Sequence, residues 1–547
     1  MSSTAAAPTS PRYTTTLIAG SLAVMAAQIA YSLSGVLNGT YQTEFNTSGA
    51  QLVWISAAFA TAMVVFELTF GVIGDLFGRK RFVLGGLAVL AVGEVVSYFA
   101  HSVHVMWLGQ GIAGFGAGAL YPLSLTMIAA AAPDHHARTR GIAIWAGFLS
   151  IGAAVSPVMA GALASGGHWR ISYLIIIGVA LVVLGTTLRA QDSSSPEGRK
   201  LDLPGQITLI LGLVALIWAV TQGSELGFGK SEIVAGFVIG SALIVAFVVI
   251  ESRSASPLLH LSLFKNRAFA LTSVVAVLGM FAFLGTAYST SIWLGAIQHT
   301  DAMKIGIVYL FIQGPAFVLV PLVARLIHGV SPRWSLTAGF VLIAVGGFIP
   351  STFDVHDVTW TSFILPLTIL GIGFALTVAS ISAVAINAVP LQLAGMASAT
   401  NNLLRDLGFA LGPIVISAIA TPIANSRLLD GIGGAIGQSG LQDPAQIGTI
   451  QGISHEAGAL AVNSLPVIPG QDGAPPLGPM PSSVSDLAFS SLGHAYNVGY
   501  LVAAVSALAC AGIVLVGLRG TKGSKYAADL GTDVVHEVAS VAEDLPA

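Results

Sequence analysis

The chain has 547 residues, of which 54% are hydrophobic and only 9% are charged, and its formal net charge is -3. Soluble domains carry about 25% charged residues, so this composition excludes a soluble globular protein and indicates a protein embedded in a membrane. The charges form no basic domain, which excludes a nucleic-acid-binding function. The one cysteine, Cys510, cannot form an intramolecular disulfide.

Apolar stretches long enough to cross a bilayer recur along the whole chain. A helix needs about 20 predominantly apolar residues to span the hydrocarbon core. The stretches predicted to span are 15–37, 52–74, 82–100, 104–130, 139–164, 170–188, 205–222, 232–250, 268–296, 304–326, 334–351, 361–388, 393–424 and 495–517. The first is too long for the apolar core of a signal peptide and lacks a convincing cleavage site, so we expect it to be retained.

These fourteen stretches place both termini on one side of the membrane. Most of the 22 Lys and Arg residues fall in the tails and loops on that side, including the run at 79–81. Because Lys and Arg favour cytoplasmic loops, we expect a multi-pass protein of the cell inner (plasma) membrane with both termini in the cytoplasm.

The longest segment outside the predicted spans, 425–494, is rich in glycine and proline and faces outward in this topology. Such a composition predicts little regular structure, with one short helix around 445–462. A role as an outer lid or partner surface is open, beside that of a simple exposed loop.

A charged motif follows the second apolar stretch and has the sequence GVIGDLFGRKR, residues 71–81. The residues of this motif that we select are Gly71, Asp75, Gly78, Arg79, Lys80 and Arg81. Basic residues alone would act as topology determinants. That interpretation leaves Asp75 and the glycines unexplained, so we expect a further role for the motif.

This motif resembles the G-x-x-x-D-x-x-G-R-K-R signature of the major facilitator superfamily. The segments 199–206, 251–269 and 395–413, with the fourteen spans, are similar to its fourteen-helix drug:proton antiporter branch. The resemblance covers nearly the whole chain. It implies an all-α integral membrane protein with 14 transmembrane helices, forming two six-helix bundles plus an inserted helix pair in the alternating-access major facilitator fold.

The resemblance also implies a division of the chain. The expected parts are a cytoplasmic N-tail (1–14), an N-terminal six-helix bundle (15–190), a linker with two inserted helices (191–266), a C-terminal six-helix bundle with the outward loop 425–494 (267–518) and a cytoplasmic C-tail (519–547). In such a fold Asp75 would lie near the N-terminus of the helix at 393–398, where the helix dipole is positive. The basic residues would then hold a cytoplasmic gate in one state through charge-assisted bonds.

The sequence departs from the family at the usual carriers of proton coupling. Proton-coupled members carry an acidic residue in helix 1, where Ala30 stands, and an arginine in helix 4, where Gln110 stands. The antiporter motif of helix 5 survives as GAAVSPVMAG, with Ser156 in place of a glycine. The residues of this motif that we select are Gly152, Ser156, Pro157 and Gly161. Their small volume and the proline favour a bent helix with close neighbours.

Ionisable residues inside the predicted spans are the remaining coupling candidates: Glu67, Glu94, Arg405 and Asp406. A charge at such depth costs roughly 2.5–3.5 kcal/mol on insertion scales, so each needs a partner, a proton or water. We hypothesise that Glu67 pairs with Arg405 in one gate state and exchanges a proton in the other; a static pair or a neutral glutamic acid is the alternative. For Glu94, in a peripheral span, a structural hydrogen bond is favoured over coupling.

Two neighbouring charges in the thirteenth span are harder to place. Arg405 and Asp406 are separated by about 100° around the helix axis, so they are not expected to face each other squarely. Asp406 neutralises Arg405 through water or lines the cavity. The polar and aromatic candidates for the cavity are Gln28, Tyr31, Gln110, Tyr121, Tyr288, Trp293, Tyr309 and Gln313. Such groups favour amphipathic cations, although helix packing also explains any single aromatic residue.

The favoured hypothesis is a secondary transporter, not an enzyme, that exports amphipathic or hydrophobic compounds in exchange for protons. It uses no cofactor and no metal; its partners are small substrates, protons and membrane lipids, with no nucleic acid, and we expect a monomer. One alternative is a facilitator or a lipid or metabolite exporter with unusual or no proton coupling. Another is a non-transporting membrane sensor or assembly partner.

Overall fold

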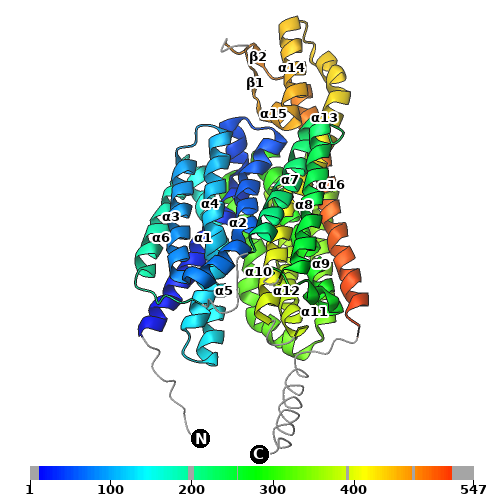
Figure 1. Ribbon diagram of the computed structural model, residues 1–547. Coiled ribbons are helices and arrows are strands. Elements are labelled where there is room, and N and C mark those ends of the chain that lie inside the picture. The colour runs from blue at the N-terminus through cyan, green and yellow to red at the C-terminus, as the bar shows by residue number, and fades with distance from the viewer. Residues whose placement is uncertain (1–10, 195–201, 255–256, 390–393, 471–474, 520–547) are drawn as a thin grey trace, which may run out of the picture.

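The computed structural model describes residues 11–194, 202–254, 257–389, 394–470 and 475–519 and is almost entirely helical (Figure 1). α1 (Pro11–Phe45) begins and α16 (Ser482–Gly517) ends at one end of the molecule, which we call the termini side. α14 (Pro444–Glu456) and α15 (Gly458–Ser464) project at the opposite end, the loop side.

The N-terminal bundle consists of α1 and the helices that follow it. Their bounds are α2 Gly49–Phe77, α3 Arg79–Tyr98, α4 Val103–Ala131, α5 His135–Ser165 and α6 Ile171–Thr187. α3 packs against α4 and α6, and α1 packs against α4 and α5. Where α3 meets α4, a Cβ on Gly116 would lie 2.5 Å from the Leu90 nitrogen. Small residues in these spans therefore set how closely the helices approach.

The C-terminal bundle contains α16 and the helices from α9 to α13. Their bounds are α9 Arg267–Ser291, α10 Ala302–Gly329, α11 Pro332–Phe348, α12 Ile364–Asn387 and α13 Ala394–Ser439. A π-helical turn, η2 (Ile292–Ile297), continues α9. Short 3-10 turns lie in the connections: η1 Leu261–Lys265, η3 Pro350–Thr352 and η4 Trp360–Phe363.

Two helices, α7 (Leu203–Leu226) and α8 (Ser231–Arg253), lie between the bundles in sequence and pack against each other. α7 also contacts both α2 and α13, so it covers the seam between the two bundles. Ile217 of α7 is buried there with Ala57 of α2 and Ile414 of α13. The inserted pair thus closes one lateral face of the seam.

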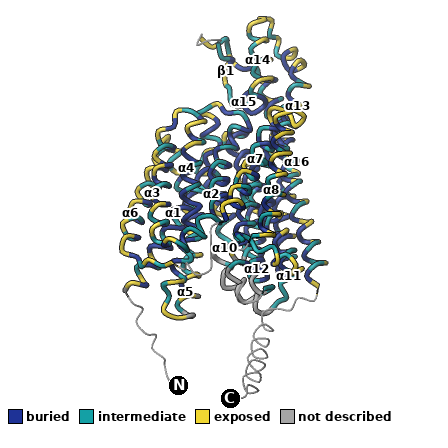
Figure 2. Tube along the Cα trace, viewed as in Figure 1, coloured by how far each residue is buried: buried dark blue, intermediate teal, exposed yellow. Residues whose placement is uncertain are grey.

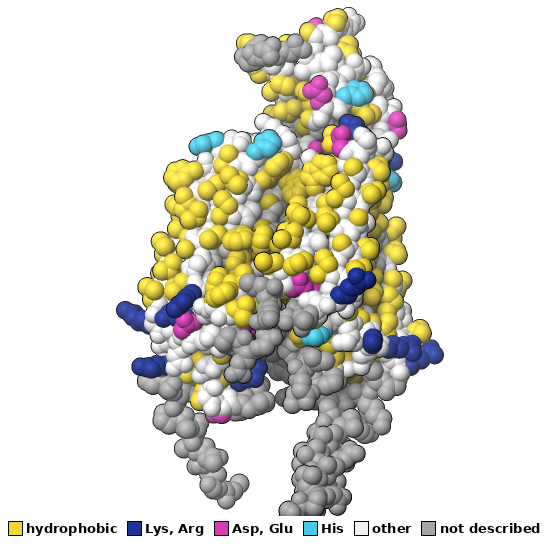
Figure 3. Space-filling view, viewed as in Figure 1, with side chains coloured by type: hydrophobic (Ala, Val, Ile, Leu, Met, Phe, Trp, Pro, Cys, Tyr) yellow, Lys and Arg dark blue, Asp and Glu magenta, His cyan; other side chains and the backbone are white. Residues whose placement is uncertain are grey.

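Each stretch predicted to span the membrane overlaps one α-helix of the structure. Within the described residues, 12 helices are long and apolar enough to cross a membrane, and two shorter apolar helices, Ile171–Thr187 and Ala302–Pro315, accompany them. Large apolar side chains on the outer faces are exposed, such as Val245 at 63% and Leu508 at 58%. Buried residues concentrate inside the molecule (Figure 2), and apolar side chains cover its visible flank (Figure 3), as a lipid-facing surface requires.

The expectation of little regular structure in segment 425–494 is wrong. α13 continues to Ser439, α14 and α15 follow, and β1 (Val467–Ile468) pairs with β2 (Gly478–Pro479). The glycine-rich composition did not indicate the apolar side chains that are buried here, namely Ile432, Ile450, Leu460 and Val484. Burial of these side chains provides the free energy that orders the segment.

The two bundles touch closely on the loop side. A Cβ added to Gly39 of α1 would collide with the backbone of Gly295 in η2, and the same holds for Gly161 of α5 against Ala302 of α10. α15 lies over the first of these contacts, since the Asn463 side chain donates to the carbonyls of Ala296 at 3.2 Å and Ile297 at 3.1 Å. These contacts close the seam at this end.

Candidate functional site

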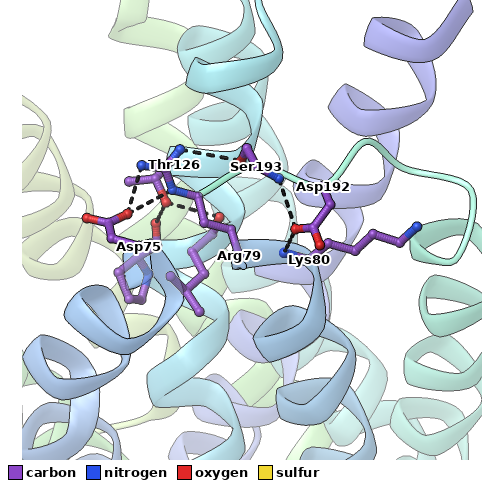
Figure 4. A network of polar contacts seen from close by, with 8 residues as sticks. Asp75, Arg79, Lys80, Thr126, Asp192 and Ser193 are labelled. Carbon is purple, nitrogen blue, oxygen red and sulfur yellow. Dashed lines mark hydrogen bonds and ion pairs between the residues drawn. The ribbon is translucent and has the colours of Figure 1, made fainter. Parts of the chain in front are cut away.

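The charged motif lies at the junction of α2 and α3 on the termini side (Figure 4). Arg79 forms an ion pair with Asp75 at 2.7 Å, one turn along the chain. The single residue between the helices, Gly78, has φ +111°, a conformation that L side chains rarely adopt. Glycine is therefore required for the tight corner that brings Arg79 over Asp75.

The segment after α6 binds this motif, which the sequence did not indicate. The Arg79 backbone N–H donates to the Ser193 carbonyl at 2.9 Å, and the Lys80 N–H donates to Asp192 Oδ1 at 3.2 Å (Figure 4). These bonds satisfy free N–H groups at the start of α3. Arg81 Nε lies 3.9 Å from Asp192 Oδ2. Gly71, by contrast, has open space around it.

The expected contact between Asp75 and the start of the thirteenth helix, at 393–398, falls partly outside the described residues. α13 is described from Ala394 onward. The contact therefore stays a prediction, and the motif's described partners belong to the N-terminal bundle and the linker.

The antiporter-motif helix α5 connects α1 with α10. The Ser156 hydroxyl donates to the Ile29 carbonyl at 2.6 Å, and a Cβ on Gly152 would lie 2.8 Å from the Met25 carbonyl oxygen. Further along, Pro157 packs against Gly306 of α10. The substitution of glycine by serine thus adds a hydrogen bond to α1 and keeps the close packing.

A cavity lies between the bundles, among α1, α2, α5, α9, α10 and α13. Of the predicted cavity residues, Tyr31, Tyr288, Tyr309 and Gln313 line it. Asn38, Ser34 and Ser56 also line it and were not selected from the sequence. The spacing of Tyr31, Ser34 and Asn38 on one face of α1 was the signal that could have identified them.

The other predicted cavity residues lie elsewhere. The Tyr121 hydroxyl donates to Gln28 Oε1 at 2.7 Å, and neither side chain is among the described residues that line the cavity. Gln110 donates to Ser97 at 3.0 Å inside the N-terminal bundle. Trp293 is fully buried and packs against Phe363 and Tyr500. Neither Gln110 nor Trp293 is among the described residues that line the cavity.

A charged cluster of Glu67, Arg405 and Asp406 lies next to the cavity, toward the termini side. Arg405 binds Asp406 through Nε to Oδ1 at 2.9 Å and Nη2 to Oδ2 at 3.3 Å. The expectation that these neighbours would not face each other is therefore wrong, because the long arginine side chain folds back along the helix. The Glu67 carboxyl lies close enough to Asp406 and to Arg405 for their charges to interact, and its Oε2 atom has no hydrogen-bond partner among the described residues.

The cluster lies on the termini side of the cavity, along α2 and α13. Ala60 of α2 and Ala410 of α13 line the cavity. Glu67 lies about 10 Å beyond Ala60, and Asp406 about 6 Å before Ala410, at a rise of 1.5 Å per residue. Glu67 and Asp406 are 7% and 4% exposed. Tyr121 lies within electrostatic reach of both, and Tyr31 within reach of Asp406, so the cluster extends to α1 and α4.

Glu94 occupies a separate place inside the N-terminal bundle. Its side chain is fully buried, and neither carboxyl oxygen has a hydrogen-bond partner among the described residues. The hydroxyl pair of Tyr41 and Tyr173, 2.7 Å apart, lies within its electrostatic reach. The structural hydrogen bond expected for Glu94 is therefore absent from the described part of the chain.

The described residues contain no group of three or more His, Cys, Asp or Glu side chains that could hold a metal ion. Residues 20–413 match the family model described as "Major Facilitator Superfamily". The chain belongs to the Major Facilitator Superfamily. It is accordingly a multi-pass membrane transporter and not an enzyme, and the superfamily inferred from the motif at 71–81 is confirmed.

Curated relatives of this superfamily protein are bacterial efflux proteins. It is 28% identical to "Multidrug resistance protein Stp" of Mycobacterium tuberculosis over 74% of this chain and 75% of that protein. It is 26% identical to "Multidrug efflux pump LfrA" of Mycolicibacterium smegmatis, over 70% and 76%. The "Tetracenomycin C resistance and export protein" of Streptomyces glaucescens is 24% identical over 91% and 90%.

Solved transporters share the fold at low sequence identity. The nucleoside transporter NupG superposes with a TM-score of 0.59 at 11% identity, covering 92% of this chain and 100% of that one. A bacterial homologue of the human lysosomal transporter Spinster gives a TM-score of 0.57 at 15% identity, covering 94% and 98%. These likenesses establish the fold alone.

Proposed function

We propose that this transporter exports amphipathic or hydrophobic compounds in exchange for protons, by alternating access of the two bundles to the central cavity. The observation that carries the proposal is the cluster of Glu67, Arg405 and Asp406 below the cavity, at the seam between bundles. Its relatives are named for multidrug resistance and efflux, which supports small-molecule substrates.

The cluster can exchange a proton for a cation. Two carboxyl groups share a hydrogen bond only when one of them holds a proton. With one proton, the three side chains are neutral in sum; without it, they carry one negative charge. A cationic substrate is therefore favoured by proton loss, and proton uptake favours its release.

We further propose that the chain crosses the bacterial inner membrane fourteen times, with both termini in the cytoplasm, and works as a monomer in contact with membrane lipids. Lys and Arg side chains on the visible face gather toward the termini side (Figure 3), which supports this orientation. In it, the motif at 71–81 lies at the cytoplasmic gate, and α14 and α15 lie outside the cell.

A facilitator without proton coupling is the second candidate. It is favoured because positions 30 and 110, where proton-coupled members carry a charge, are uncharged in this chain. Ala30 is buried, and Gln110 is bonded to Ser97 away from the cavity. Sealed vesicles with the purified protein separate the two functions. Addition of a lipophilic cation to wild type should dissipate a pH gradient, and Glu67→Gln should abolish this. Cation movement without proton movement in both proteins would establish the facilitator instead.

A further inference from the structure

Asn38 is a cavity-lining side chain with an unused hydrogen-bond acceptor. It is 1% exposed, and its amide nitrogen donates to Ser291 Oγ of α9 at 2.8 Å. Its Oδ1 atom has no hydrogen-bond partner among the described residues. Buried polar atoms in native proteins are nearly always paired, so an unpaired atom that borders a cavity is available to accept a bond from a ligand.

The surrounding network determines which way the Asn38 amide points. The Tyr309 hydroxyl donates its proton to the Ala287 carbonyl at 2.7 Å. Ser291 lies close to Tyr309, and neither hydroxyl bonds to Asn38 Oδ1. The Ser291 oxygen accepts from Asn38. The amide nitrogen of Asn38 therefore faces Ser291, and the oxygen remains for another donor.

The cavity around Asn38 is mainly apolar and aromatic, with Ser32, Ser34, Ser56 and Gln313 as further uncharged polar side chains. Phe283, Tyr288 and Phe409 line it, and Phe283 stacks on Phe374 with ring centroids 4.1 Å apart. No Asp, Glu, Lys or Arg is among the described lining residues. A ligand therefore meets aromatic walls and few polar groups, so each polar group has a large influence on selectivity.

We propose that Asn38 Oδ1 is a specificity-determining acceptor that binds an N–H or O–H group of the substrate. The substrate class is an aromatic, amphipathic compound that carries such a donor on its ring system. The proposal rests on the proposed function for the cavity itself and adds the hydrogen-bond chemistry that selects among substrates. An analogue without the donor leaves Oδ1 unpaired and binds less tightly.

Two related dyes test this selectivity. Rhodamine 6G carries secondary amine N–H groups, whereas tetramethylrhodamine ethyl ester has dimethylamino groups in their place; both are cationic ethyl esters. Their equilibrium binding to the purified protein is measured by fluorescence anisotropy. We expect wild type to bind rhodamine 6G roughly three- to tenfold more tightly, the ratio that one hydrogen bond gives. In Asn38→Leu and in the smaller Asn38→Ala, the ratio should fall to about one.

Ser56→Ala is the matched control, because Ser56 also lines the cavity but its hydroxyl already donates to the Val53 carbonyl at 3.2 Å, and it leaves the Asn38 amide held by Ser291. The proposal requires this variant to retain the wild-type ratio. Loss of the ratio in Ser56→Ala as well, equal binding of the dyes by wild type, or tighter binding of the dimethylamino dye would overturn it. Binding does not depend on proton flux, so selective binding without proton-linked transport would refute the proposed antiport and leave this inference standing.

Discussion

The carboxyl groups of Glu67 and Asp406 lie close enough for their charges to interact across the seam between the two bundles. Asp406 is at the same time bound in a bidentate ion pair by Arg405. Because Glu67 belongs to α2 and Asp406 to α13, separation of the bundles would break the carboxyl contact and leave the arginine pair intact. Relative movement of the bundles and proton occupancy are therefore linked at one place.

The first prediction is that Glu67 and Asp406 act as one unit. Glu67→Gln and Asp406→Asn should each lower proton-linked efflux by about tenfold or more. The double variant should be as active as the less active of the two single variants. Efflux is measured as cation-driven dissipation of a pH gradient in sealed vesicles. Additive losses in the double variant would mean that the two carboxyl groups work independently.

The second prediction concerns the motif on the termini side. Asp75→Asn should lower transport about tenfold with membrane insertion intact, because it removes the charge that binds Arg79. Asp192→Asn is a matched control, since an asparagine oxygen still accepts from the Lys80 N–H, and should keep most activity. Dye efflux from cells, normalised to the amount of protein in the membrane, measures both. Equal losses of transport in the two variants would mean that transport depends on the contact between Asp192 and Lys80 as much as on the pair of Asp75 and Arg79.

The sequence predicted the helical framework well, because apolar length and charge segregation are local properties. Contacts between side chains distant in sequence could not be predicted from such local properties. Asp192 is distant in sequence from Lys80, and no local pattern relates them. Arg405 and Asp406 were misjudged because helix geometry fixes Cβ directions but not the path of a long side chain. Segment 425–494 was misjudged because its few apolar residues pack only in three dimensions.

The third prediction concerns closure on the loop side. Gly39→Ala places a Cβ against the Gly295 backbone, so it should hold the bundles apart there. Overpacking costs about 1–3 kcal/mol, enough to favour the open state by roughly tenfold. With Cys510 replaced by serine, a cysteine at Ser34 reports access from the loop side to an impermeant maleimide. Labelling should rise in Gly39→Ala.

Gly433→Ala provides the control for this experiment, because Gly433 lies in the same loop-side region with open space around its Cα. Labelling of this variant should equal that of the parent. If Gly39→Ala is labelled no faster than Gly433→Ala, the contact between Gly39 and Gly295 does not hold the loop side closed.

The fourth prediction separates Glu94 from the coupling machinery. Glu94 is fully buried, lies away from the cavity lining and has no hydrogen-bond partner for either carboxyl oxygen among the described residues. Replacement of an unpaired polar group by an apolar group of similar shape removes a desolvation cost, which is about 1–3 kcal/mol in proteins. Glu94→Leu should therefore retain or raise the unfolding temperature, and Glu94→Gln should keep at least about half of the transport rate. Thermal unfolding in detergent and dye efflux measure the two effects.

If Glu94→Gln loses proton-linked efflux as completely as Glu67→Gln does, Glu94 belongs to the proton pathway. The hydroxyl pair of Tyr41 and Tyr173 then becomes its expected route to the loop side.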